Sequence, residues 1–224
     1  MQKANTANSL TKFMYRLFET IRISGGNAGN LFWHRQRLES SYRALFGKAP
    51  GFELEEIVSV PPEFRQGLFR CRVDYNLHRW KISFTPYLIP GISSLKLVED
   101  NTIDYRFKYT DRSRLDRLFS LRGPCDDVLI VKNGLITDTS IANVILWDGT
   151  QWHTPSTPLL QGTCRARLLS EGKIIASDIR AADLRSFSKI RLINAMRGMN
   201  DGNDISTSHI SEESAEHPDS TGHN

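Results

Sequence analysis

The stretch Gly134-Leu-Ile-Thr-Asp138-Thr-Ser-Ile-Ala-Asn143 sets a carboxylate among small and apolar residues, and the rest of the site is arranged around it. Lys108 comes before it, just ahead of a predicted helix. Gly162-Thr163-Cys164-Arg165 comes after it and forms a turn that leads into another helix. Taken singly, these residues would usually be a solvated lysine, a turn aspartate and an ordinary helix start. Their ordered combination favours a site.

Together, these groups could bind an aldehyde cofactor that carries a phosphate. Lys108 can form a Schiff base only if its amine is deprotonated part of the time, which partial burial would favour. Asp138 can face a pyridine nitrogen, because a protonated ring accepts electrons better. Gly162 allows close backbone approach, and Thr163 and Cys164 would supply N–H groups at a helix start, where an anion is favoured. The sequence therefore predicts a site for pyridoxal 5'-phosphate (PLP).

The combination resembles the class IV aminotransferase family, the fold type IV PLP enzymes, and is closest to a short form of the 4-amino-4-deoxychorismate lyase branch. The similarity extends from about residue 13 to residue 199. The matching segments are Phe18-Glu-Thr20-Ile-Arg22, His34-Arg-Gln-Arg37-Leu38, Lys108-Tyr-Thr-Asp-Arg112, Asp127-Val-Leu-Ile-Val-Lys-Asn-Gly134, Asp138-Thr-Ser-Ile-Ala-Asn143-Val, Trp152-His-Thr154-Pro155, Gly162-Thr-Cys-Arg165 and Ile193-Asn194-Ala195-Met196.

The resemblance implies an α/β, or α+β, fold of two domains like that of D-amino-acid aminotransferase, with the active site between them. It also implies a homodimer. The chain after residue 200 is polar, with few residues that could be buried, so we expect it to be disordered. The expected organisation is an N-terminal extension over 1–12, a small N-terminal α/β domain over 13–98, a linker over 99–104, a C-terminal cofactor-binding domain over 105–200 and a disordered tail over 201–224.

Hydrophobic alternation and helical periodicity predict the elements within these domains. We expect strands over 14–23, 68–75, 80–87, 93–98, 127–132, 143–147, 173–177 and 189–194, and helices over 33–46, 111–121, 163–171 and 181–187.

The resemblance also assigns roles to individual residues. Lys108 would carry the Schiff base and then act as the catalytic base, and Thr20 would assist proton delivery. Arg37 would bind the phosphate of the cofactor. Arg22 and Asn194 are candidate substrate residues. The implied cofactor-binding set is Arg37, Lys108, Asp138, Ile141, Ala142, Asn143, Thr163 and Cys164.

Three positions depart from the family pattern. Asp138 stands where the family usually has glutamate, so its contact with the ring nitrogen could be longer or water-bridged. Cys164 stands where threonine is usual, and a thiol is a weaker hydrogen-bond donor. Ser113 replaces a tyrosine that branched-chain aminotransferases carry and that the lyase branch lacks.

Three functions follow from these matches. The first is a 4-amino-4-deoxychorismate lyase, which eliminates pyruvate and leaves 4-aminobenzoate. The second is a branched-chain or D-amino-acid aminotransferase, which would need a keto-acid acceptor. The third is a non-catalytic cofactor-binding relative, because the chain is short for this family.

Composition limits the other classes of function. The formal charge is +4 and the pI is about 9.0, but basic residues are interleaved with acidic ones, which argues against nucleic-acid binding. Positive charge would instead attract an anionic cofactor and a dicarboxylate substrate, and Arg70 and Arg72 could reach a substrate carboxylate. No metal site is predicted, because the histidines and the three cysteines lack ligand spacing. With no apolar run for a membrane span and a polar start, we expect a cytoplasmic protein.

Overall fold

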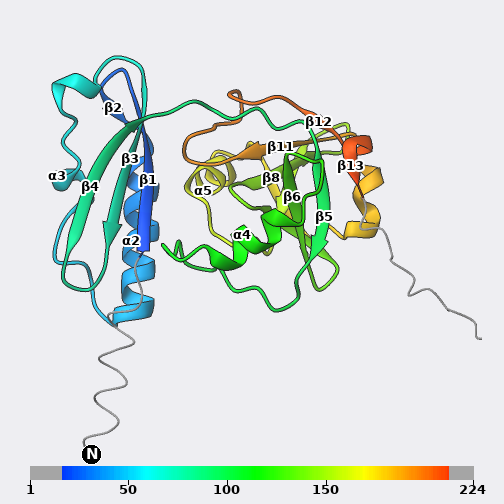
Figure 1. The fold of residues 1–224 in the computed structure, drawn as a ribbon, viewed down its shortest axis with the longest axis horizontal. Helices are drawn as coiled ribbons and strands as arrows, with labels where there is room; N and C mark the ends of the chain where they lie inside the picture. The colour runs from blue at the N-terminus through cyan, green and yellow to red at the C-terminus, as the bar shows by residue number, and fades with distance from the viewer. Residues whose placement is uncertain (1–16, 212–224) are drawn as a thin grey trace, which may run out of the picture.

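The N-terminal part of the chain folds as a four-stranded antiparallel sheet covered on one face by a helix. The computed structural model describes residues 17–211, and this part is at the left of Figure 1. The strand order is β2-β1-β3-β4. The elements are β1 (Leu17–Ser24), β2 (Asn27–Ala28), α2 (Leu31–Phe46), α3 (Leu54–Ile57), the 3-10 helix η1 (Pro62–Phe64), β3 (Leu68–Tyr75) and β4 (Trp80–Pro86).

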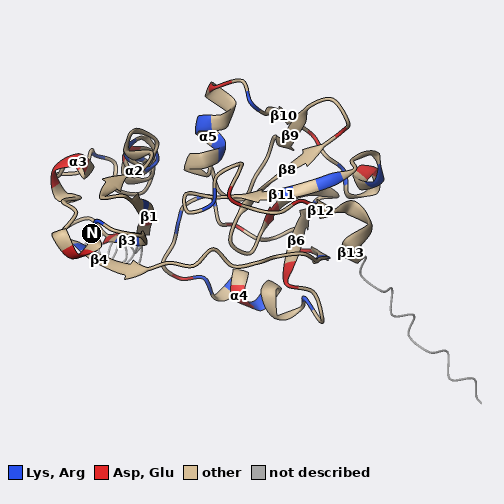
Figure 2. Cartoon of the chain, turned by 90° about the horizontal axis from the view of Figure 1, so that it is seen from above, with Lys and Arg blue, Asp and Glu red and all other residues tan. Residues whose placement is uncertain are grey.

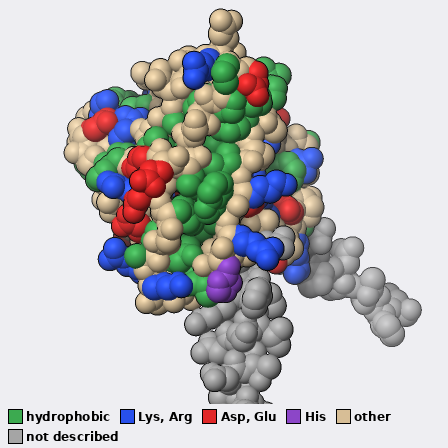
Figure 3. Space-filling view, turned by 90° about the vertical axis from the view of Figure 1, so that its left-hand side faces the viewer, with side chains coloured by type: hydrophobic (Ala, Val, Ile, Leu, Met, Phe, Trp, Pro, Cys, Tyr) green, Lys and Arg blue, Asp and Glu red, His purple; other side chains and the backbone are tan. Residues whose placement is uncertain are grey.

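Alternation along β1 separates the two faces of this sheet. Leu17, Ile21 and Ile23 are fully buried and pack with Leu38 and Tyr42 of α2. Since successive side chains of a strand point to opposite faces, the intervening residues of β1 face away from α2. That second face looks toward the rest of the molecule and supplies part of the site described below. On the side of the molecule formed by this domain, Figure 3 shows a band of hydrophobic side chains.

The C-terminal part is built on a larger sheet with strand order β10-β9-β8-β7-β6-β5-β13, in which β11 pairs with β8 and β12. Helices α4 and α5 and two 3-10 helices accompany it (Figure 1). The elements are β5 (Leu95–Glu99), α4 (Ser113–Ser120), β6 (Asp127–Lys132), β7 (Leu135–Thr139), β8 (Asn143–Trp147), β9 (Trp152–Pro155), α5 (Thr163–Ser170), β10 (Ile175–Ser177), η2 (Ala181–Ser186), β11 (Lys189–Ile193), β12 (Ile205–Ser206), η3 (Thr207–His209) and β13 (Ile210–Ser211).

Strand β7, which carries Asp138, follows β6 through a two-residue turn. Asn133 and Gly134 both have positive φ, 52° and 74°. An Asn-Gly pair with positive φ at both positions is the preferred connection of a tight β-hairpin. The sequence analysis did not predict β7 or β9, although it singled out residues in both.

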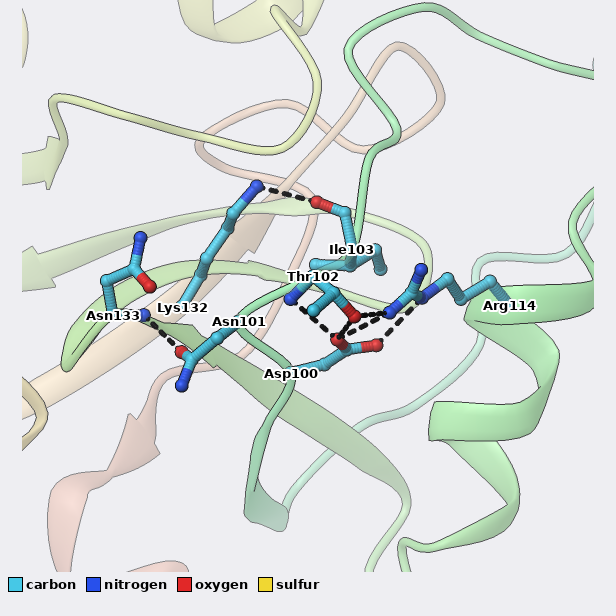
Figure 4. Close-up of polar contacts among 7 residues, drawn as sticks. All are labelled: Asp100, Asn101, Thr102, Ile103, Arg114, Lys132 and Asn133. Carbon is cyan, nitrogen blue, oxygen red and sulfur yellow. Dashed lines mark hydrogen bonds and ion pairs between the residues drawn. The ribbon is translucent and has the colours of Figure 1, made fainter.

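The boundary between the domains differs from the prediction. The chain crosses from the first sheet to the second over residues 87–94, and β5 pairs in parallel with β6, so the predicted strand over 93–98 belongs to the second domain. The predicted linker over 99–104 is a turn fixed against that domain (Figure 4). Asp100 accepts hydrogen bonds from the Arg114 Nε at 2.8 Å, and Lys132 Nζ donates to the Ile103 carbonyl at 2.6 Å. The polar side chains of this segment therefore form the hydrogen bonds of a turn and do not mark a linker.

The prediction that 201–224 is disordered is wrong for residues 201–211. Ile205 is 2% exposed and packs into the core of the second domain, and Ile210 pairs with Leu95. A polar segment folds here because its two isoleucines meet an existing apolar surface. Residues 212–224 and the predicted N-terminal extension over 1–12 lie outside the described residues.

Charged positions are spread over both domains, with basic and acidic segments interleaved (Figure 2). Between residues 17 and 211, no helix has the length and apolar character needed to cross a membrane.

Candidate functional site

A cavity of about 320 Å³ lies between the two domains. The open face of the first sheet forms one wall, and β7, the loop after it and the start of α5 form the other. Arg22 and Cys164 are not among its lining residues. The predicted site residues that do line it are Thr20, Arg37, Lys108, Asp138, Ile141, Ala142, Asn143, Thr163 and Asn194.

Lys108 lies in the segment before α4, which runs beside the start of β1. Its carbonyl accepts a hydrogen bond from the Phe18 N–H at 3.0 Å, and its Nζ lies 4.6 Å from the centre of the Phe18 ring. Burial, joined by the positive charge of Arg37 and opposed by the charge of Glu19, lowers the pKa of Lys108 to about 7. A large fraction of this amine is therefore unprotonated near neutral pH, as a nucleophile or base requires.

Asp138 is a buried carboxyl at the end of β7. Its Oδ1 accepts from Asn143 Nδ2 at 2.8 Å and its Oδ2 accepts from the Leu160 N–H at 2.9 Å. Burial raises the pKa of Asp138 to about 6, although the bonds from Asn143 and Leu160 act in the opposite direction. The carboxyl is fixed in place by these bonds and lines the cavity.

The turn before α5 approaches the Asp138 loop very closely. A Cβ on Gly162 would lie 1.8 Å from Asn143 Oδ1, so only glycine fits there. Thr163 is buried, lines the cavity and begins α5, whose first N–H groups have no partner within the helix. The opening of α5 is thus an anion-binding geometry.

Cys164 corrects one detail of the prediction. It is 1% exposed and packs with Ile145 and Leu168 in a hydrophobic cluster. The thiol therefore belongs to this cluster and not to the cavity lining. Replacement of the usual threonine by cysteine suits this apolar position.

Arg37 belongs to a buried charge network that the sequence analysis missed. Its Nε donates to Glu19 Oε1 at 3.0 Å, its second terminal nitrogen pairs with Glu19 Oε2, and its other terminal nitrogen donates to the Gln161 carbonyl at 3.3 Å. His34 Nδ1 lies 2.6 Å from Glu19 Oε2. One signal was present: the alternation of β1 puts Glu19 on the buried face, where a charge needs partners.

The two candidate substrate residues have structural partners. Arg22 forms an ion pair with Asp201 and donates to the Met196 carbonyl at 3.0 Å, so it ties the two domains together outside the cavity. Asn194 lines the cavity, but its Oδ1 accepts from the N–H groups of Met196 and Arg197, both at 2.9 Å. Its side chain shapes the turn over 194–197.

Three arginines line the cavity in addition to Arg37, although Arg22 does not. Arg70 and Arg72 of β3 line the cavity, as does Arg112, which the sequence analysis quoted without a role. Arg72 is paired with Asp74 at 2.7 Å, whereas the hydrogen bond of Arg70 Nε goes to the neutral Thr85 hydroxyl at 3.3 Å. Asp138 is the carboxylate in the lining. The wall therefore favours an anionic ligand.

Among residues 17–211, no three histidine, cysteine, aspartate or glutamate side chains are grouped as metal ligands would be. The functional groups that line the cavity include an amine, a carboxyl, guanidinium groups and the start of α5.

Comparison with known proteins agrees with this arrangement. Residues 91–202 match the model of the family described as "Amino-transferase class IV". A protein of Haemophilus influenzae, described only as uncharacterized, is 42% identical over 188 residues, which make up 83% of this chain and 100% of that protein.

The chain belongs to the class IV aminotransferase family.

Solved structures show the same fold. A protein of Haemophilus somnus 129pt, provisionally named a 4-amino-4-deoxychorismate lyase, has a TM-score of 0.79 and 41% identity, covering 83% of this chain and 98% of its own. A hypothetical aminotransferase of Mycobacterium tuberculosis, in a PLP-bound form, has a TM-score of 0.71 over 88% of this chain and 81% of its own. At 18% identity that likeness shows the fold alone. The expected fold of the fold type IV enzymes is confirmed.

Proposed function

We propose that this member of the class IV aminotransferase family is a PLP-dependent 4-amino-4-deoxychorismate lyase, which eliminates pyruvate and leaves 4-aminobenzoate. The observation that carries the proposal is that one cavity is lined by Lys108, Asp138, Thr20 and the start of α5. The similarity to the Haemophilus somnus protein over nearly its whole length supports the choice of reaction.

The residues present fit the cofactor. Arg37 and the backbone N–H groups of Thr163 and the rest of the first turn of α5 would hold its phosphate, and the space kept open by Gly162 lets that backbone come close. Asp138 would face the pyridine nitrogen, and Lys108 Nζ would bond to the aldehyde carbon. When bound, PLP would act as the electron sink for a carbanion next to the substrate nitrogen.

The protein residues would then move two protons. Once the substrate amine has replaced it on the aldehyde carbon, the free Lys108 amine, with a pKa of about 7, can accept at Nζ the proton from the carbon that bears the substrate nitrogen. Thr20, on the cavity face of β1, would assist proton delivery to the departing three-carbon group, which leaves as pyruvate. Arg70, Arg72 and Arg112 would attract the two carboxylates of the substrate.

An aminotransferase is the second candidate, since the family as a whole supports it and Lys108 would serve both reactions. The two differ in what they consume. A lyase releases pyruvate from its substrate alone, whereas an aminotransferase needs a keto acid to complete its cycle.

The deciding experiment incubates the purified protein with PLP and aminodeoxychorismate, with and without 2-oxoglutarate. The proposal predicts equal amounts of pyruvate and 4-aminobenzoate, with no requirement for the keto acid. Formation of glutamate from 2-oxoglutarate, dependent on the added amino donor, would establish the aminotransferase instead. Absence of turnover in protein that holds PLP on Lys108 would identify a non-catalytic relative.

A further inference from the structure

The anion site at the start of α5 is assembled from both domains. Arg37 comes from α2 of the first domain and Thr163 from α5 of the second, and the two helices contact each other. A phosphate held by both needs the two groups at a fixed separation. A third group that touches each of them would supply that constraint.

Glu19 is the first half of such a group. It is fully buried on the face of β1 that packs against α2, and it accepts hydrogen bonds from two nitrogens of Arg37. Although burial alone would raise the pKa of Glu19, the charge of Arg37 and the hydrogen bond of His34 lower it to about 2. The carboxylate therefore stays charged, and it fixes the plane and direction of the Arg37 guanidinium.

His34 is the second half. It is also fully buried; its Nδ1 lies 2.6 Å from Glu19 Oε2 and its Nε2 lies 3.5 Å from Thr163 Oγ1. Burial lowers the pKa of His34 against the opposing effect of Glu19, which favours the neutral ring. With Nδ1–H donated to the carboxylate, Nε2 is an acceptor, so the Thr163 hydroxyl donates to it.

Stability alone does not account for this chain of contacts. A buried group of an arginine, a carboxylate and a histidine contributes little net stability, because the desolvation of its charges offsets their attraction. Its consequence is geometric: Thr163, His34, Glu19 and Arg37 form one connected path from the start of α5 to the guanidinium. Neither Glu19 nor His34 is among the residues that line the cavity.

We propose that Glu19 and His34 are positioning residues, which set Arg37 and Thr163 in register across the domain junction so that the cavity recognises a phosphate group. The proposal rests on the proposed function, because it concerns the cofactor's phosphate. The proposal therefore predicts that loss of this positioning weakens binding of the phosphate group and leaves binding of the rest of the ligand unchanged.

The test compares two probes, PLP and pyridoxal, which differ by the phosphate alone. Each is titrated into the full chain purified without added cofactor, and binding is followed by visible absorbance. We expect His34→Leu to weaken PLP binding by about tenfold, the cost of roughly one hydrogen bond to a charged group, and to leave pyridoxal binding unchanged. His34→Gln, whose amide can both donate and accept, should restore much of the preference for PLP.

A matched control is available in the second domain. His153 Nε2 contacts Asp148 at 2.8 Å and its Nδ1 contacts Ser177 at 3.1 Å, so it also joins a carboxylate to a hydroxyl, but it does not line the cavity. His153→Leu should change neither affinity. This control tests whether removal of any histidine that joins a carboxylate to a hydroxyl lowers the affinity for PLP by a general effect on the fold.

A double-mutant cycle tests the path itself. If His34 acts through Thr163, then Thr163→Val and His34→Leu together should weaken PLP binding by less than the product of the two single effects. Folded variants that retain the wild-type preference for PLP over pyridoxal would overturn the inference, as would equal losses for both probes. Should His34→Leu fail to fold, Thr163→Val alone must still reduce that preference. Wild-type protein that does not distinguish PLP from pyridoxal would instead overturn the proposed cofactor, and this inference with it.

Discussion

Burial shifts the pKa values of two ionisable residues of the cavity in opposite directions. Burial disfavours the charged form of each, so the pKa of Lys108 falls to about 7 and that of Asp138 rises to about 6. Both groups therefore change protonation near neutral pH. Perturbed pairs of this kind are typical of sites that move protons.

The reactivity of Lys108 should follow this pKa. We expect its labelling by a small aldehyde with cyanoborohydride to be half-maximal near pH 7, about three units below an ordinary lysine. Peptide mass spectrometry across a pH series would measure it. The unfolded chain binds more protons between pH 7 and 10.5, so the contribution of Lys108 to the free energy of unfolding should rise across that window. A labelling midpoint near pH 10 would contradict the burial of the amine.

Gly162 should be intolerant of even one added carbon. In Gly162→Ala the Cβ would meet Asn143 Oδ1, so we expect a loss of about 1–3 kcal/mol in the free energy of unfolding, the usual cost of overpacking, together with weaker PLP binding. Gly51→Ala is the control, since nothing lies within 4 Å of the Cβ position. Denaturant unfolding measures both. Equal stability of the two variants would disprove the close contact.

At the scale of elements, local sequence patterns predicted the strands and helices that have a clear hydrophobic periodicity, and missed strands that form only through pairing with a neighbour. The alternation in β1, β3 and β4 and the apolar stripe of α2 are local, and those elements lie where the sequence indicated. Strand β7 was missed because Thr137, Asp138 and Thr139 are polar and become strand residues through pairing with β6. The predicted helix over 181–187 is the 3-10 helix η2.

The site shows the same limit. Lys108, Asp138 and Gly162, which all line the cavity, were singled out from the sequence because each proposed role needs a particular residue type. Glu19, His34 and Arg112 were not assigned roles, because their significance arises from contacts between residues far apart in the sequence. Arg22 was proposed as a substrate residue, and its pair with Asp201 was not predicted, because Asp201 lies in a segment that composition alone indicated to be disordered.

That segment gives a prediction at the scale of one element. Ile205 is buried in the core of the second domain, so Ile205→Ala should lower the free energy of unfolding by about 2–5 kcal/mol. Ile175→Ala, at a residue 40% exposed, should cost much less. Truncation after Asn200 should destabilise the protein as well. Unchanged thermal unfolding after truncation would show that residues 201–211 do not contribute to the fold.

At the scale of the whole molecule, the cavity depends on how the two domains are held. The segment over 194–205 contacts the first domain through Arg22 and Asp201. It also holds the crossing segment, where Asn203 Nδ2 donates to the Ile92 carbonyl at 3.0 Å and Arg197 donates to the Pro90 carbonyl. The turn over 194–197 thus belongs both to the cavity wall and to the junction.

Loss of the Arg22 contacts should loosen this junction more than it destabilises the fold. For Arg22→Met we expect a change of no more than about 1 kcal/mol in the free energy of unfolding, because the ion pair is partly exposed. Amide hydrogen exchange should nevertheless be faster over residues 194–201. Arg43→Met, which removes the exposed pair with Glu39, is the control and should leave that exchange unchanged. Identical exchange in the two variants would show that the contacts of Arg22 do not hold the two domains together at this position.

The central claim is that Lys108 bonds covalently to PLP in this cavity. The most direct test is the visible spectrum of the full chain with PLP, beside Lys108→Ala, before and after borohydride reduction, followed by peptide mapping. We predict a visible band in the wild type that Lys108→Ala lacks, and after reduction a pyridoxyl group on Lys108. No band at saturating PLP, or a label on another lysine, would contradict the assignment.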